Sequence, residues 1–203
     1  MSISKNLLCI IFCFFFVVFF NEAMAQEQTL KYQIRVLGMD VGELTVTERV
    51  EGQDTIIEAI SDVKVRIIFT YRVKYIQRSV HRSGELLQSS LLTYKKDELN
   101  SSTELIKTGD EYMLIKDGDT SFVHGHIQYS GSLLYFHEPA NEKYMYFEIS
   151  GEKAAVESTG AHAYRIIRPD NGRESDFEYS NGILQRSAIE HRIATIYTER
   201  LPD

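Results

Sequence analysis

Cysteine is nearly absent from this sequence, because its two copies, Cys9 and Cys13, both lie within the first 25 of 203 residues. If that segment is removed, the remaining chain can form no disulfide. It also has no thiol nucleophile and no cysteine ligand for zinc. Its stability must then come from a packed core, which a chain of this length can build.

Several sequence motifs are also missing. There is no Gly-x-Ser-x-Gly elbow, no phosphate-binding glycine loop and no dinucleotide fingerprint. Basic residues are few, with 22 Lys and Arg against 29 Asp and Glu and a net charge of −7. This balance disfavours nucleic acid as a partner. No linker, low-complexity tract or fixed repeat divides the chain, so a single domain is expected.

The first 25 residues have the pattern of an export signal. Lys5 precedes fourteen uninterrupted apolar residues, and Ala23-Met24-Ala25 forms a small-x-small cleavage site. The apolar run is shorter than the roughly 20 residues that a membrane-spanning helix needs. We therefore predict a signal peptide at 1–25, with an uncleaved anchor as the alternative, and no membrane span after cleavage. The protein is expected in the periplasm or on the outer-membrane surface of a Gram-negative bacterium, or outside the cell.

Residues 26–203 alternate between apolar and polar side chains, which is typical of half-buried antiparallel strands. The longest run is Val63–Tyr75, in which every odd position is apolar or aromatic. We interpret it as one strand of roughly 43 Å that bends within the sheet. After Tyr75 the apolar positions Ile76 and Val80 are even, which suggests a change of phase at a β-bulge.

Turn signals separate the alternating runs at short intervals, as in Ser83-Gly84, Asp117-Gly118 and Ser180-Asn181-Gly182. The compact apolar stretch at 130–137 breaks this rhythm, starts at a potential capping serine, Ser130, and stops before Pro139. The sequence therefore predicts an all-β domain over 26–203. Its expected form is a curled antiparallel sheet, a β-roll or open barrel, with one short helix at 130–137 that plugs an open end.

Three strings in this sequence resemble landmarks of small secreted bacterial families that are classed as domains of unknown function. The strings are Tyr32-x-Ile34-x(3)-Gly38-x(2)-Val41-Gly42-x-Leu44-Thr45, Leu134-Tyr135-Phe136-x-Glu138-Pro139 and Tyr179-x-Asn181-Gly182-Ile183-Leu184. The resemblance spans most of the chain after the signal. It implies a periplasmic or surface β protein with a curled antiparallel sheet, and it supplies no catalytic residues.

Two histidines, His124 and His126, would project from the same face of a strand, as imidazole ligands do in metal-binding barrels. The Gly118-x(5)-His124-Gly125-His126 string is similar to the first metal motif of cupins. That motif continues with a glutamate four or five residues later, where this chain has Ser130 and Gly131. His137 and Glu138 could replace it only if the fold returns them to the site. No cofactor is expected, and a divalent metal at His124, His126 and His137 is the alternative.

A basic face on the long strand is the second candidate site, formed by Lys64, Arg66, Arg72 and Lys74. Such a face could attract an anionic lipid headgroup or an acidic glycan. The alternative is an ordinary solvated face whose charges pair across the sheet. Aromatic residues of this strand would lie on its opposite face, which argues against stacking with nucleic-acid bases.

The leading functional hypothesis is a non-enzymatic binding or accessory module of the cell envelope, with an apolar or amphipathic ligand inside the rolled sheet. Lipid, glycan or an envelope protein are the expected partners. A cavity beyond about 300 Å³ would support this hypothesis, and a filled interior would exclude it. One alternative is a metal-dependent enzyme that uses His124 and His126. The other is a structural partner of an outer-membrane assembly that docks through a sheet edge.

Overall fold

The computed structural model of the chain describes residues 27–66 and 70–202. The export signal expected at 1–25 lies outside these residues. Along the described chain, no helix combines the length and the apolar character needed to cross a membrane.

The described residues form fourteen strands in a single sheet, in which every neighbouring pair is antiparallel. In chain order they are β1 (Glu27–Val36), β2 (Met39–Glu51), β3 (Asp54–Arg66), β4 (Thr70–Arg82), β5 (Glu85–Lys95), β6 (Glu98–Thr108), β7 (Glu111–Lys116), β8 (Asp119–His124), β9 (Tyr144–Tyr146), β10 (Lys153–Gly160), β11 (Ala163–Ile167), β12 (Glu174–Ser180), β13 (Ile183–Ile189) and β14 (Ile196–Arg200).

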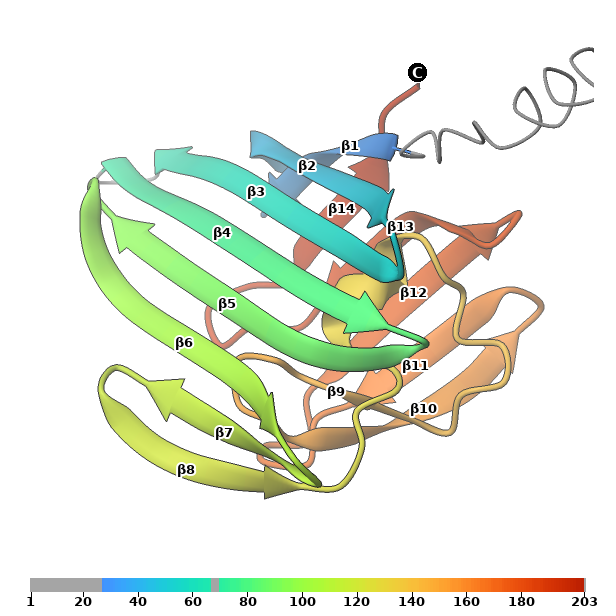
Figure 1. The fold of residues 1–203 in the computed structure, drawn as a ribbon. Coiled ribbons are helices and arrows are strands. Elements are labelled where there is room, and N and C mark those ends of the chain that lie inside the picture. The colour runs from blue at the N-terminus through green and yellow to red at the C-terminus, as the bar shows by residue number, and fades with distance from the viewer. Residues whose placement is uncertain (1–26, 67–69, 203) are drawn as a thin grey trace, which may run out of the picture.

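The sheet curls without closing. β1 pairs with both β2 and β14 and so joins the first eight strands to the last six, while β8 and β9 form the two edges. Figure 1 shows a broad layer of β2–β6 facing a second layer that contains β11–β13. The predicted all-β fold, a curled antiparallel sheet in the form of an open barrel, is confirmed.

The predicted turns lie at the strand ends. Ser83 and Gly84, between β4 and β5, have φ values of 52° and 78°, and Asn181 and Gly182, between β12 and β13, have 52° and 79°. Two successive residues with positive φ match the right-handed twist of the strands that they connect. Local chemistry therefore determines these hairpins.

The prediction of one strand over Val63–Tyr75 is wrong, because β3 ends at Arg66 and β4 runs back antiparallel from Thr70. Ile67, Ile68 and Phe69, which the prediction placed within this strand, lie outside the described residues. Odd residues of β3 pair with odd residues of β4, as in Val63 opposite Val73. Because paired residues share a face, the period-two pattern continues through the hairpin and resembles one long strand.

The predicted change of phase after Tyr75 is also wrong for the pairing with β3, which continues without a shift. Gln77, Ser79 and His81 stay on the inner face and are buried. A register shift does occur against β5, between Val80 and His81. The apolar pattern changes after Tyr75 because the inward-facing positions of β4 there hold polar residues, and the strand itself does not change phase against β3.

The predicted helix is a single 3₁₀ element, η2 (Gly131–Tyr135), within the connection between β8 and β9. It contacts β3 and β13 and lies between the two layers (Figure 1). Ser130 occupies the N-cap position, but its side chain makes no capping hydrogen bond. Its hydroxyl oxygen instead lies 3.2 Å from Nε2 of His81 and 3.2 Å from the Ser132 hydroxyl oxygen.

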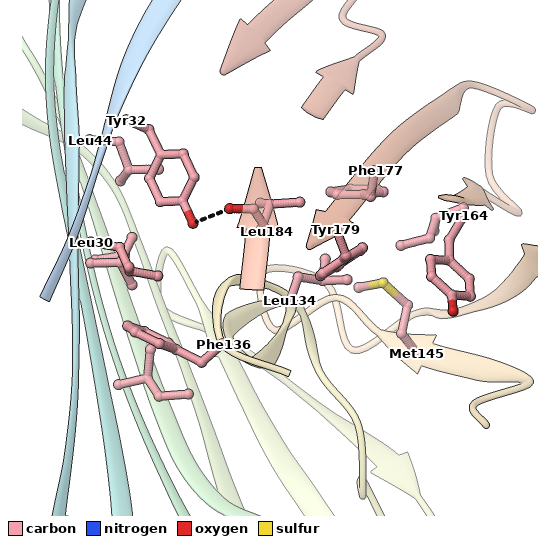
Figure 2. Close-up of a cluster of buried hydrophobic side chains, with 14 of the residues drawn as sticks. Leu30, Tyr32, Leu44, Leu134, Phe136, Met145, Tyr164, Phe177, Tyr179 and Leu184 are labelled. Atoms are coloured by element: carbon pink, nitrogen blue, oxygen red, sulfur yellow. Dashed lines mark hydrogen bonds between the residues drawn. The ribbon is translucent and has the colours of Figure 1, made fainter. Parts of the chain in front are cut away.

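The main core fills the space between the layers. Figure 2 shows Leu30 and Tyr32 of β1 and Leu44 of β2 facing Phe177 and Leu184 of the second layer, with side chains of the η2 segment between them. The buried hydroxyl of Tyr32 donates a hydrogen bond of 3.0 Å to the carbonyl oxygen of Leu184. A smaller core beneath β5–β8 contains Leu86, Leu105, Tyr112, Leu114 and Ile127.

Candidate functional site

A cavity of about 210 Å³ lies beside η2, between β4 and β5 on one side and β12, β13 and β14 on the other. It is smaller than the 300 Å³ that would have supported a carrier of ordinary ligands, yet the interior is not filled. A pocket of this size accepts a molecule somewhat larger than benzene, for which about 150 Å³ is enough. Apolar residues form much of its wall: Leu91, Leu134, Met145, Phe147, Ile149, Phe177, Leu184 and Ile189.

Strand β4 contributes a polar section to this wall. The Tyr75 hydroxyl donates to Oε1 of Gln77 at 2.6 Å, and Nε2 of Gln77 donates to the Ser79 hydroxyl at 3.2 Å. Ser79 in turn lies 2.9 Å from the hydroxyl of Ser89 on β5. Because each member has a partner, this buried chain fixes the side-chain orientations of the wall.

Glu148, in the turn between β9 and β10, places a carboxylate in the cavity wall. The residue is only 4% exposed. Its Oε1 accepts a 3.0 Å hydrogen bond from the Ser132 backbone N–H in η2. Its Oε2 would lie 3.0 Å from a Cβ at Gly131, so glycine leaves the space that this carboxylate occupies.

The two tyrosines of the wall remain protonated at neutral pH. Burial raises the pKa of Tyr135 to about 12, and the charge of Glu148 adds to the shift. The pKa of Tyr75 is raised mainly by burial, then by Tyr135 and Glu148. Both phenols can therefore serve as neutral hydrogen-bonding groups beside the carboxylate.

Arg168, which follows β11, is the other charged residue among the described cavity-lining side chains. Its guanidinium carbon lies 4.5 Å from the ring centroid of Phe147. Nη2 is 3.8 Å from Glu152, and Nε is 3.5 Å from Asp170. Within the described part of the chain, the Arg168 Nε–H has no hydrogen-bond partner.

The predicted basic residues lie away from this cavity. Lys64, Arg72 and Lys74 share the outer face of the β3–β4 hairpin, where Lys64 is opposite Arg72. Arg72 contacts Asp62 at 2.5 Å and Asp97 at 3.2 Å, so acidic neighbours offset this face. Arg66 ends β3 on the same face of the hairpin register, and its side chain is not described.

The predicted metal ligands are distributed over three separate ion pairs. His124 pairs with Glu111 at 3.1 Å, His126 with Glu85 at 2.7 Å and His137 with Glu48 at 2.5 Å. Within residues 27–66 and 70–202, no three His, Cys, Asp or Glu side chains form a group suited to a metal ion. The structure therefore does not bring these three histidines together as a ligand set.

A larger hollow of about 330 Å³ lies on the outer face of β12–β14. Its charged groups bind one another, since Glu199 contacts Arg35 and Arg186 at 2.9 Å each. The smaller interior cavity contains a buried carboxylate, Glu148, that forms no ion pair with the residues that the structure describes. For that reason we take this cavity as the candidate site.

Sequence reasoning did not identify Glu148, Gln77 or Ser79. The one available signal was the row of polar residues at odd positions of β4, where an inward face was expected to be apolar. Glu148 lies in a turn without periodicity, and its burial depends on how η2 packs against that turn.

Comparison with known proteins supports the fold and the predicted resemblance. A crystal structure of a beta-barrel-like protein of domain of unknown function DUF1849 from Brucella abortus is similar, with a TM-score of 0.56 and 8% sequence identity. The similarity covers 87% of this chain and 96% of the other. Among curated proteins, none matches this sequence. Residues 32–201 match the model of the family described as Domain of unknown function (DUF6134), and the chain belongs to that family.

Proposed function

We propose that the protein is a binding module that holds one small amphipathic molecule in the cavity beside η2. The supporting observation is a 210 Å³ space with largely apolar walls and a buried carboxylate that forms no ion pair with the described residues. A ligand that covers the apolar side chains of this wall removes apolar surface from water, which favours binding. The polar groups of Tyr75, Gln77 and Glu148 would orient that ligand.

Binding fits this wall better than acid–base catalysis does. General acids and bases work best when their pKa lies near the operating pH. The pKa values of Tyr75 and Tyr135 are instead raised away from neutrality. We also propose that the protein is exported, which predicts Gln26 as the first residue of the protein recovered from a bacterial envelope fraction.

The binding proposal is tested by the thermal unfolding midpoint in the presence of small monocyclic aromatic compounds. A ligand at 100 times its Kd stabilises the native state by about 2.7 kcal/mol, a shift of roughly 5–10 °C for a chain of this size. Leu91→Phe adds atoms to the cavity wall and is expected to abolish the shift. Leu99→Phe, at an exposed position on β6, is the control that should retain it. Equal shifts in the two variants would place the bound molecule elsewhere.

A further inference from the structure

We propose that the cavity selects small organic ammonium ions, in which an apolar body carries a positively charged nitrogen, and that the Glu148 carboxylate pairs with this nitrogen. This inference rests on the proposed binding function and names its ligand class.

Glu148 differs from two other glutamates that lie in or contact the segment around η2. Glu48 and Glu138 have side-chain exposures of 17% and 11%, and each pairs with a histidine. Glu148 is more deeply buried, yet no basic side chain of the described residues lies within ion-pair distance of it. Carboxylates are seldom buried without a partner, because removal from water strongly disfavours the charge.

A structural role accounts for only one of its two oxygens. Oε1 accepts the Ser132 N–H, and a neutral amide oxygen could do the same. Oε2 accepts no hydrogen bond from the described residues, although Gly131 leaves room for it. The second oxygen and the charge therefore remain available to a ligand.

The surrounding rings suit a cation. Tyr75, Tyr135, Phe147 and Phe177 line the same cavity, and the electron-rich faces of aromatic rings attract ammonium groups. Arg168 also lines the cavity, but its charge faces Glu152 and Asp170 and it is already stacked on Phe147. Of the two charged residues in the described wall, Glu148 is therefore the one without an oppositely charged neighbour.

Three probes of nearly equal size test the ligand class by calorimetry at pH 7: 2-phenylethylamine, 2-phenylethanol and 3-phenylpropanoate. The native protein is expected to bind the amine about tenfold or more tightly than the alcohol, with the anion weakest. Glu148→Gln keeps the acceptor for Ser132 and should remove the preference for the amine. Glu142→Gln, at an exposed loop position, is the matched control and should retain it.

The outcomes separate this inference from the proposed function. Equal binding of the amine and the alcohol by the native protein overturns the ammonium preference, while the proposed binding of a small ligand still stands. This comparison needs no variant. A preference for the amine that persists in Glu148→Gln overturns the role of Glu148. Binding of none of the three probes overturns both proposals.

Discussion

Nε2 of His81 on β4 lies 3.2 Å from the hydroxyl oxygen of Ser130, the residue that precedes η2. Both residues are buried, and the other ring nitrogen of His81, Nδ1, has no hydrogen-bond partner among residues 27–66 and 70–202. This contact ties the first layer of the sheet to the segment that fills the interior. Its strength depends on the protonation state of a ring that is shielded from water.

Acid is expected to weaken the fold through His81. Burial, and then the charge of His137, lowers its pKa from 6.5 to about 4, while Glu48 opposes the shift. Between these two values the unfolded chain binds a proton that the native protein excludes, so stability falls as the pH falls from 6.5 towards 4. At pH 4.5 this effect amounts to about 2–3 kcal/mol. Urea denaturation at pH 7 and pH 4.5 measures it.

The variant His81→Gln isolates this contribution. Between pH 7 and pH 4.5 its free energy of unfolding should fall by about 2 kcal/mol less than that of the native protein. The carboxylates titrate in both proteins, so both retain the rest of the decrease. His191→Gln, at an exposed histidine in the loop before β14, is the control for loss of an imidazole and should keep the native pH dependence. If His81→Gln shows the native difference as well, His81 does not cause the acid sensitivity.

Alternation and turn chemistry were enough to predict the fold class, because both act locally along each strand. They failed at Val63–Tyr75, where the register of the β3–β4 hairpin keeps odd residues on one face through the reversal. A pattern of period two cannot distinguish a strand from a hairpin with that register. A turn signal is needed to separate them, and Ile67-Ile68-Phe69 contains none.

The candidate cavity was less predictable than the fold, since its residues come from distant parts of the chain. Tyr75 and Glu148 contribute to one wall, and η2 separates them in sequence. The spacing of His124 and His126 in the sequence suggested a metal site, yet each histidine pairs with a different glutamate. Local spacing identifies candidate ligands, and only the tertiary structure determines whether they converge.

Tyr32→Phe is expected to weaken the connection between the two layers. The fully buried hydroxyl donates to the Leu184 carbonyl across 152 residues of sequence. Its loss leaves that carbonyl without this donor, at a cost of about 1–2 kcal/mol. The thermal midpoint should fall by several degrees. Tyr197→Phe, at a half-exposed tyrosine on β14, should change it little, and a similar effect of both substitutions would count against the interlayer bond.

Gly42→Ala is expected to disturb the pairing of β2 with β3. A Cβ at this position would lie 2.2 Å from the Asp62 carbonyl oxygen and 3.0 Å from the Val63 Cα. Both are backbone atoms, so relief requires the strands to separate, at a cost of about 1–3 kcal/mol. Gly160→Ala is the control, because its nearest neighbour would be Ala163 at 3.8 Å. The midpoint of chemical denaturation should therefore be clearly lower for Gly42→Ala than for Gly160→Ala. Equal midpoints would contradict the close approach at Gly42.

The outer basic face gives a prediction about anionic ligands. Arg72 holds the pKa of Asp62 below its usual value, with Lys74 and Lys64 adding to the effect. Asp62→Asn removes the negative charge that offsets these cations and should increase binding to vesicles with anionic lipids, by about 1 kcal/mol at low salt. The lost ion pair is exposed, so stability should change by less than about 1 kcal/mol. Asp54→Asn, which breaks a similar pair with Arg82 at the other end of β3, controls for net charge. Vesicle sedimentation distinguishes the two variants, and an equal gain would show that net charge, rather than the face formed by Lys64, Arg72 and Lys74, governs the binding.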